Sequence, residues 1–160
     1  MKIFIASDHA GVELKSALVN EMSKSQWLPS FKREVIDLGP QSTDSVDYPD
    51  FANAVCEKIH SLEALSLDGT YSFPKEMGIL ICGSGQGMAM RANKFSHIRA
   101  ALCTDKELTR LSREHNDANV ICLGARFTST DAALKLLEIF FTTEFAGGRH
   151  SQRVQKICRM

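Results

Sequence analysis

Short apolar runs alternate with amphipathic stretches along this chain. Five runs of strand length contain β-branched residues, and they lie at Ile3–Ala6, Val35–Leu38, Ile79–Cys82, Ile98–Cys103 and Val120–Leu123. Between them, apolar residues recur at helical spacing in 14–22 and 50–59. Strands that alternate with helices predict right-handed crossovers and a mostly parallel five-stranded sheet with helices on both faces. The pattern therefore predicts the α/β class.

Helix-start signals mark two further elements. The segment Thr104-Asp105-Lys106-Glu107 has the form of a capping box, which predicts a helix with Leu108 and Leu111 on its apolar face. Thr130 can cap a helix that carries Leu134, Leu137 and Phe141. The loop-like stretches Ser23–Arg33 and Ser61–Lys75 are polar or interrupted by proline or glycine, and we interpret them as surface excursions. Residues 1–160 are therefore expected to form a single domain.

Net charge, apolar run length and cysteine usage indicate which partners and which cellular compartment to expect. The 19 basic residues balance the 19 acidic ones, so no overall field favours nucleic acid or an anionic membrane, and an anion site must be local. No apolar run approaches the ~18 residues of a spanning helix. The cysteines are odd in number and form no Cys-x-x-Cys pair, which favours a cytoplasmic, reducing setting and argues against structural zinc. They are Cys56, Cys82, Cys103, Cys122 and Cys158.

Polar loops follow three of the predicted strands, where open parallel sheets bind their ligands. They are Ser7-Asp8-His9, Gly83-Ser84-Gly85-Gln86-Gly87 and Gly124-Ala125-Arg126. The glycine-rich loop opens a helix and gathers backbone N–H groups into an anion cradle, although a plain tight turn would have the same composition. It is not a dinucleotide fingerprint, because Met88 stands where the last glycine would be.

Cys82 and His115 are the candidates for proton transfer. The helix end that follows Cys82 would favour a thiolate, which can act as a general base; the alternative is a core cysteine, as we expect for Cys103 and Cys122. His115 follows Leu111 at helical spacing and could be a core histidine, but the polar residues after it indicate a helix end.

The carboxyl-terminal segment carries two arginines at helical spacing. Arg149 and Arg153 are one turn apart, while Val154, Ile157 and Cys158 form a packing stripe. Two guanidinium groups on one side can clamp a phosphate, or they can belong to an ordinary solvated face. Together with Arg126 they suggest a phosphorylated ligand in an otherwise neutral protein.

Seven short blocks, in this order, resemble ribose-5-phosphate isomerase B, and together they span nearly the whole chain. They are Ser7-Asp8-His9-Ala10-Gly11, Asp47-Tyr48-Pro49, 78–85, Ala92-Asn93-Lys94, Ile98-Arg99-Ala100, 115–119 and Gly148–Arg153. The resemblance implies a three-layer Rossmann-like α/β/α sandwich, at least homodimeric, with active sites shared between subunits and no metal or organic cofactor. It implies an aldose-ketose isomerase for ribose 5-phosphate and ribulose 5-phosphate in the non-oxidative pentose phosphate pathway.

The resemblance also assigns roles to residues. Cys82 becomes the base and His115 the group that opens the sugar ring, while Asp8 and Asn116 hold sugar hydroxyls. The loop residues Gly83, Ser84, Gly85, Gln86 and Gly87 would stabilise the enediolate, and His9, Arg126, Arg149 and Arg153 would bind the phosphate. Tyr48 is a weaker candidate for lining the pocket. Relatives that lack the cysteine use a glutamate just after the glycine loop, where this chain has Met88.

The polarity of the predicted strands separates the two proton-transfer groups. His115 precedes the fifth strand and lies near its amino end, whereas Cys82 lies at a carboxyl end. A working site is therefore expected to combine Cys82 of one chain with His115 of another, in a homodimer or a dimer of dimers, with a carboxyl-terminal helix over about 148–158 packed on the partner. Two alternatives stay open: an isomerase of a six-carbon sugar phosphate such as galactose 6-phosphate or allose 6-phosphate, and a non-catalytic sugar-phosphate sensor.

Overall fold

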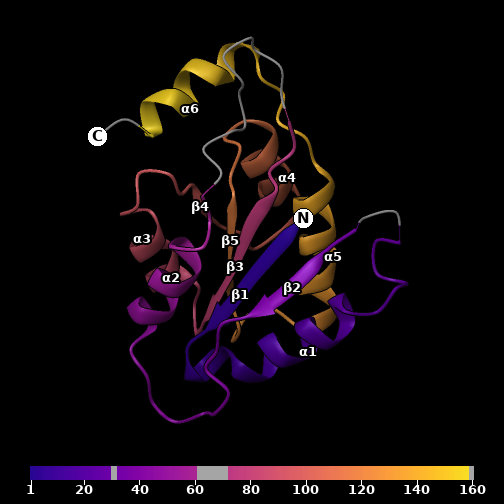
Figure 1. Ribbon diagram of the computed structural model, residues 1–160, viewed down its shortest axis with the longest axis vertical. Coiled ribbons are helices and arrows are strands. Elements are labelled where there is room, and N and C mark those ends of the chain that lie inside the picture. Colours follow the sequence, from indigo (N-terminus) through magenta and orange to yellow (C-terminus); the bar gives the residue numbers. More distant parts are fainter. Residues whose placement is uncertain (30–31, 61–71, 159–160) are drawn as a thin grey trace.

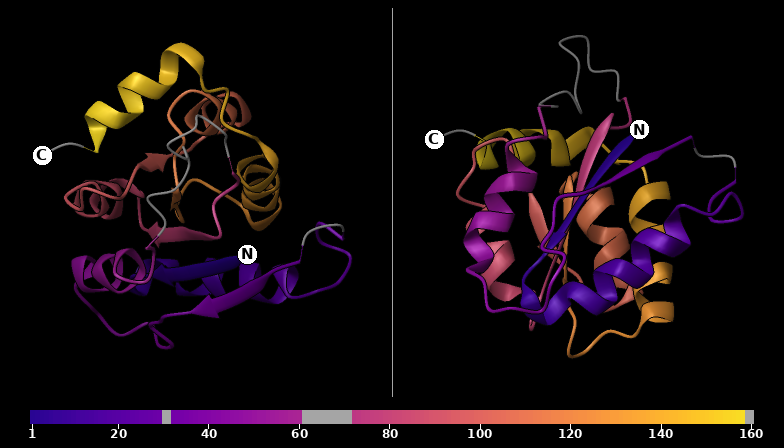
Figure 2. Two further views of the ribbon diagram at one scale, coloured as in Figure 1. Left: turned by 45° about the horizontal axis from the view of Figure 1, so that its top comes forward. Right: turned by 60° about the horizontal axis from the view of Figure 1, so that its bottom comes forward.

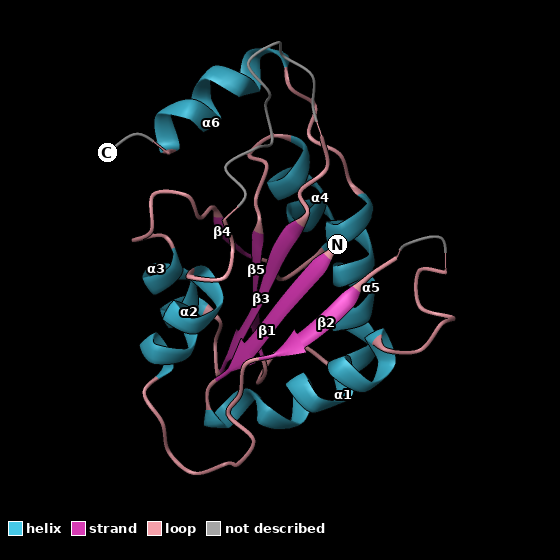
Figure 3. Cartoon of the chain, viewed as in Figure 1, coloured by secondary structure: helices cyan, strands magenta, loops and turns pink. Residues whose placement is uncertain are grey.

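The computed structural model describes residues 1–29, 32–60 and 72–158 (Figure 1). Residues 30–31 of the first predicted excursion and 61–71 of the second lie outside the described residues. Within the described ranges, strands and helices alternate along the chain (Figure 3). The predicted α/β class is confirmed.

Five strands form one sheet in which every neighbouring pair runs parallel. The strands are β1 (Lys2–Ser7), β2 (Glu34–Asp37), β3 (Glu76–Cys82), β4 (Ala100–Leu102) and β5 (Val120–Gly124). Their order across the sheet is β2-β1-β3-β5-β4, so β3 lies between β1 and β5. The loops that follow β1, β3 and β5 therefore emerge side by side from the carboxyl end of the sheet.

Helices cover both faces of the sheet, as the right-hand view of Figure 2 shows. Their bounds are η1 (His9–Gly11), α1 (Val12–Met22), α2 (Tyr48–Cys56), α3 (Gln86–Ala92), α4 (Lys106–Glu114), α5 (Thr130–Thr142), η2 (Gly148–His150) and α6 (Ser151–Ile157). α1 and α5 pack on one face, with α4 beside α5, while α2 and α3 pack on the other. No helix in the described parts of the chain combines the length and the apolar character needed to cross a bilayer.

The alternation of side chains along β1 divides the core into two layers. Ile3 and Ile5 pack in the apolar cluster that includes Leu18 of α1 and Phe140 of α5. Phe4 and Ala6 point to the other face and belong to the cluster with α2 and α3. Successive residues of a strand face opposite ways, so a nearly continuous apolar strand is what a sheet covered on both faces requires. The three-layer sandwich is thereby confirmed.

Details at the helix starts differ from the prediction. The side chain that caps α4 is Asp105, which accepts from the Leu108 N–H, and Ser129 caps α5, so each cap is one residue away from the predicted threonine. The expected apolar face of α4 is also wrong. Leu108 is 52% exposed, and the buried residues of this helix are Thr109 and Arg113.

Candidate active site

Cys82 is the last residue of β3 and lies at the carboxyl end of the sheet, 5% exposed. The chain turns sharply after it, and the Gly85 N–H donates to the Cys82 Sγ across 3.1 Å. Gly85 has a φ of +79°, and a Cβ there would approach Leu102 to 2.5 Å. Only glycine fits both the left-handed backbone and this close packing, so the sequence of the loop determines how the backbone wraps around the sulfur.

Arg126 lies against the beginning of the same loop. Its backbone N–H donates to the Gly83 carbonyl, and its guanidinium carbon lies 3.3 Å from where a Gly83 Cβ would be. The Ser84 hydroxyl accepts from the Gln86 N–H at 3.4 Å. Both Ser84 and Arg126 are exposed, so a cation and a hydroxyl lie at the loop that begins directly after the buried thiol.

The loop after β1 adds a carboxylate and an imidazole. The Asp8 N–H donates to the carbonyl of Ile81, next to Cys82, and the Asp8 carboxylate caps η1 by accepting from Ala10 and Gly11. The Nδ1 of His9 accepts from the Val46 N–H at 3.3 Å, which leaves Nε2 to carry the proton of the neutral ring. These contacts hold Asp8 and His9 beside the end of β3.

Tyr48, the first residue of α2, borders the glycine loop on its other side. Its ring carbons lie 2.7 to 3.1 Å from where a Gly87 Cβ would be, and the side chain is 39% exposed. The absence of a side chain at Gly87 therefore allows the ring to lie against the loop. That Tyr48 lines a substrate pocket stays a prediction.

His115 and the carboxyl-terminal arginines gather at the other end of the molecule, where α6 lies at the top of Figure 1. His115 is the cap residue that follows α4, and its ring stacks on His150 with centroids 4.3 Å apart and planes at 6°. Arg149 and Arg153 are exposed and border a common hollow of about 540 Å³. Desolvation lowers the pKa of His150, and the positive charges of its neighbours lower it further.

Within one chain, Cys82 and His115 lie at opposite ends of the sheet. Cys82 pairs with Gly124, whereas Val120, at the start of β5, pairs with Gly78, four residues earlier on β3. At ~3.3 Å per residue this is a separation of about 13 Å along the strands, and His115 precedes Val120. The carboxyl end collects Asp8, His9, Cys82, Gly83–Gly87 and Arg126, and the opposite end collects His115, Asn116, Arg149 and Arg153.

Three further cysteines are buried: Cys56 and Cys122 lie in the same apolar cluster as Cys82, and Cys103 lies in the other. Burial raises the pKa of Cys56 to about 12, raises that of Cys103, and raises that of Cys122 well above its usual value. They are core thiols, as the sequence predicted for Cys103 and Cys122. Across the described ranges, no cluster of three or more His, Cys, Asp or Glu side chains could hold a metal ion.

Comparison with known proteins identifies the family. The sequence profile described as Ribose/Galactose Isomerase matches residues 3–157, almost the whole chain. The chain belongs to the ribose/galactose isomerase family. The resemblance drawn from the short sequence blocks is thereby confirmed, and the chain is an isomerase by membership.

Relatives in the ribose/galactose isomerase family match over more than nine tenths of their lengths. Ribose-5-phosphate isomerase B of Escherichia coli is 36% identical over 156 residues, which cover 98% of this chain and 93% of the relative. The Clostridium thermocellum ribose-5-phosphate isomerase B structure has a TM-score of 0.83 at 44% identity and covers 99% of this chain and 95% of its own. The Mycoplasma genitalium ribose-5-phosphate isomerase B structure, with bound ribulose-5-phosphate, has a TM-score of 0.82 at 38% identity. The match covers 99% of this chain and 94% of the Mycoplasma chain.

Two features near His115 were not predicted from the sequence of this family member. One is the stacking of His150 on His115, and the other is a buried ion cluster of Arg99, Arg113 and Asp117. The four-residue spacing of Arg113 and Asp117 is a signal for an ion pair on a helix. Its burial could not be read from the sequence, because charged residues at that spacing are usually solvated.

Proposed function

We propose that this chain interconverts D-ribose 5-phosphate and D-ribulose 5-phosphate, with Cys82 as the base that moves the proton between C1 and C2. Membership of the ribose/galactose isomerase family supports the reaction class, and the ribulose-5-phosphate bound to the Mycoplasma genitalium relative supports the substrate. The observation that carries the proposal is the environment of Cys82. A thiol at the carboxyl end of a central strand receives an N–H from its own glycine loop, and the guanidinium of Arg126 lies against the next residue, Gly83.

The chemistry of the step matches these groups. The Cys82 thiolate takes the proton from C2 of the open-chain aldose, which leaves an enediolate with its negative charge on O1. The resulting thiol returns a proton to C1, and the hydroxyl proton of O2 passes to O1, which gives the ketose and restores the thiolate. Preorganised N–H groups of Gly83–Gly87 and the Ser84 hydroxyl stabilise the oxyanion, and removing one such donor typically costs ~2.7–4 kcal/mol of barrier. Met88 is fully buried in the core, so it offers no substitute for the base.

Ring opening and substrate binding are shared between the two chains that form each site. His115 of one subunit opens the sugar ring bound beside Cys82 of the other, and Asp8 and Asn116 hold sugar hydroxyls. His9 and Arg126 from one subunit and Arg149 and Arg153 from the other bind the phosphate. No metal or organic cofactor takes part in this scheme.

A homodimer, alone or paired into a tetramer, is required by this arrangement. Ile157 of α6 supports it: this residue belongs to the predicted packing stripe, yet it is 52% exposed, whereas Val154 on the same stripe is buried. We infer that α6 completes its packing on the partner subunit. The whole chain acts as one sugar-phosphate isomerase domain.

A turnover assay with ribose 5-phosphate tests the proposal. Cys82→Ala should lose ~10²–10⁴-fold in kcat, the range for removing a general base. Cys122→Ala is the matched control, because Cys122 is a buried thiol on the neighbouring strand, and it should retain activity. Equal rates in wild type and Cys82→Ala would remove the thiol from the mechanism. Turnover of galactose 6-phosphate or allose 6-phosphate alone would reassign the substrate, and no turnover of any of them would favour a sensor.

A further inference from the structure

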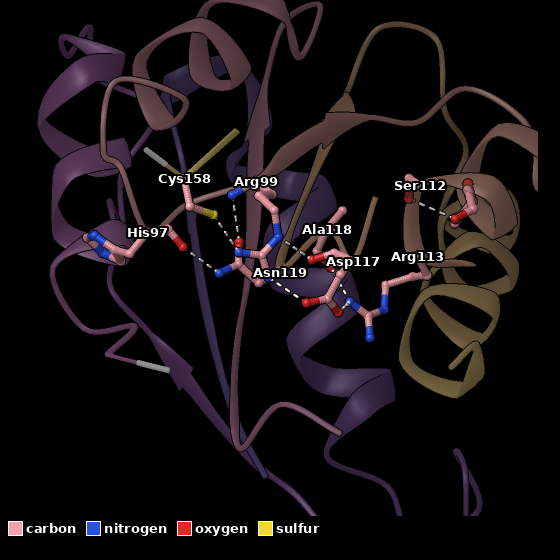
Figure 4. A network of polar contacts seen from close by, with 9 residues as sticks. His97, Arg99, Ser112, Arg113, Asp117, Ala118, Asn119 and Cys158 are labelled. Carbon is pink, nitrogen blue, oxygen red and sulfur yellow. Dashed lines mark hydrogen bonds and ion pairs between the residues drawn. The ribbon is translucent and has the colours of Figure 1, made fainter. Parts of the chain in front are cut away.

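A buried ion cluster of Arg99, Arg113 and Asp117 includes the residue directly after His115 and Asn116, and Figure 4 shows its three side chains. The Asp117 carboxylate accepts from Arg99 Nη2 at 2.7 Å and from Arg113 Nη1 at 2.9 Å. Asp117 and Arg113 are fully buried, and Arg99 is 6% exposed. None of the three has a role in the proton transfers or in the phosphate binding proposed above.

The same two guanidinium groups also hold the backbone of the turn. Arg99 Nε donates to the Asp117 carbonyl at 2.7 Å, and Arg113 Nη1 donates to the Ala118 carbonyl at 2.6 Å. Asp117 has a φ of +47°, a left-handed conformation that is uncommon for a residue with a side chain. The contacts therefore stabilise a backbone shape that immediately follows His115 and Asn116.

The cluster connects this turn to two other parts of the chain. The Arg99 N–H donates to Asn119 Oδ1, and Asn119 Nδ2 donates to the His97 carbonyl, so the turn is tied to the segment that enters β4. At the far side, Arg99 Nη1 lies 3.4 Å from Cys158 Sγ at the end of α6. Arg99 therefore fixes the His115 turn relative to the helix that carries Arg153.

Buried ion pairs are a weak source of stability, because the cost of desolvating the charges offsets much of their attraction. This cluster provides a defined geometry instead. The planar guanidinium groups of Arg99 and Arg113 fix the positions of the Asp117 carboxylate and of the Asp117 and Ala118 carbonyls. We propose that Arg99 and Asp117 are positioning residues that hold His115 in the orientation needed to open the sugar ring. The inference rests on the proposed function, and it adds residues that act through His115 without touching the substrate.

Ring opening and carbon-proton transfer can be measured separately, because ribulose 5-phosphate is acyclic. Its C5 oxygen carries the phosphate, so the C2 ketone cannot close a five-membered ring. In D₂O the Cys82 thiolate can take a C1 proton, exchange it with solvent and return a deuteron to C1 of the same ketose. This exchange needs the base and the enediolate but no ring opening. Isomerisation of ribose 5-phosphate needs both.

The test uses two conservative variants of the full-length protein. Asp117→Asn removes the charge and keeps a residue that tolerates the left-handed backbone, and Arg99→Lys keeps the charge but loses the fork. Arg110→Lys is the control, since Arg110 forms an exposed ion pair with Glu107 on the same helix. Both activities are measured at saturation, so that weaker binding through Asn116 appears in KM. Circular dichroism and mass in solution establish that each variant is folded and assembled.

We expect kcat for isomerisation to fall roughly 10- to 100-fold in both variants, as for a misplacement of about 1 Å at a reacting group. Deuterium uptake at C1 should stay at the wild-type rate, and Arg110→Lys should change neither activity. Equal losses of the two activities in a folded variant, or no loss in either, would overturn the inference and leave the proposed function standing. A wild-type protein that neither isomerises nor exchanges would refute the proposed function and this inference with it. If one variant fails to fold, the other decides.

Discussion

Subunits that each lack one proton-transfer group should complement one another in a mixed dimer. The perturbations are Cys82→Ala in one chain and His115→Ala in the other. The pairing of β3 with β5 places Cys82 about 13 Å along the strands from the level of Val120, the start of the strand that His115 precedes, whereas a general acid or base must lie within ~3 Å of the proton that it moves. The two groups of one chain therefore cannot act on adjacent atoms of one sugar.

The size of the recovery follows from symmetry. A two-fold dimer has two equivalent sites, and each would take Cys82 from one subunit and His115 from the other. In a mixed dimer one site has both groups intact and the other has neither. Heterodimers purified through two different tags should therefore have about half of the wild-type turnover per dimer, and an equal mixture after random subunit exchange about one quarter.

A second heterodimer gives the opposite result and serves as the control. Wild-type chains paired with the double variant Cys82→Ala/His115→Ala have no complete site if the sites are shared, but one complete site if each chain acts alone. We expect this heterodimer to be inactive in ribose 5-phosphate turnover. The reasoning is refuted if the double-variant heterodimer keeps half of the activity while the heterodimer of single variants has none.

Two further predictions concern the geometry of each half of the site. Gly85→Ala places a Cβ 2.5 Å from Leu102 in a backbone with φ +79°, so it should cost at least ~1 kcal/mol and lower the Tm by a few degrees, with a larger loss of turnover; an unchanged melting curve would contradict this. Because the pKa of His150 is lowered in the folded protein, the unfolded chain binds the proton more readily, and stability should fall as pH drops below the ordinary value of 6.5. Urea unfolding at pH 7.5 and 5.5 should show a smaller pH-dependent loss in His150→Gln than in wild type, and equal losses would exclude His150 as a cause.

The sequence predicted the class of fold because apolar periodicity is a local property. The run Ile79–Cys82 is apolar at every position, which a sheet covered on both faces demands, and β3 forms there. It also predicted the loops that bear Asp8, Cys82 and Arg126, since polar residues after parallel strands meet at one end of a sheet. The helix caps were misplaced by one residue, because neighbouring Thr, Asp and Ser side chains can all accept from the first turn.

The burial of α4 shows where local patterns fail. Leucine spacing predicted an apolar face through Leu108 and Leu111, yet Arg113 and Thr109 are the buried residues. A buried guanidinium is stable only when acceptors surround it, and Asp117 and the Ala118 carbonyl, four and five residues along the chain, supply them here. The spacing is local, but the contact of Arg99 with the same carboxylate and the burial of the cluster depend on tertiary packing.

Strand order and the distribution of the site residues were decided by the tertiary structure. The sequence determined which residues are strands, which loops are polar and which side chains can carry a proton or bind a phosphate. Only the packing of β3 between β1 and β5 brings the loops of Asp8, Cys82 and Arg126 side by side, whereas the place of His115 at the opposite end already followed from the direction of the predicted strands. The physical reason is that secondary structure depends on neighbours along the chain, whereas a site depends on which elements pack side by side.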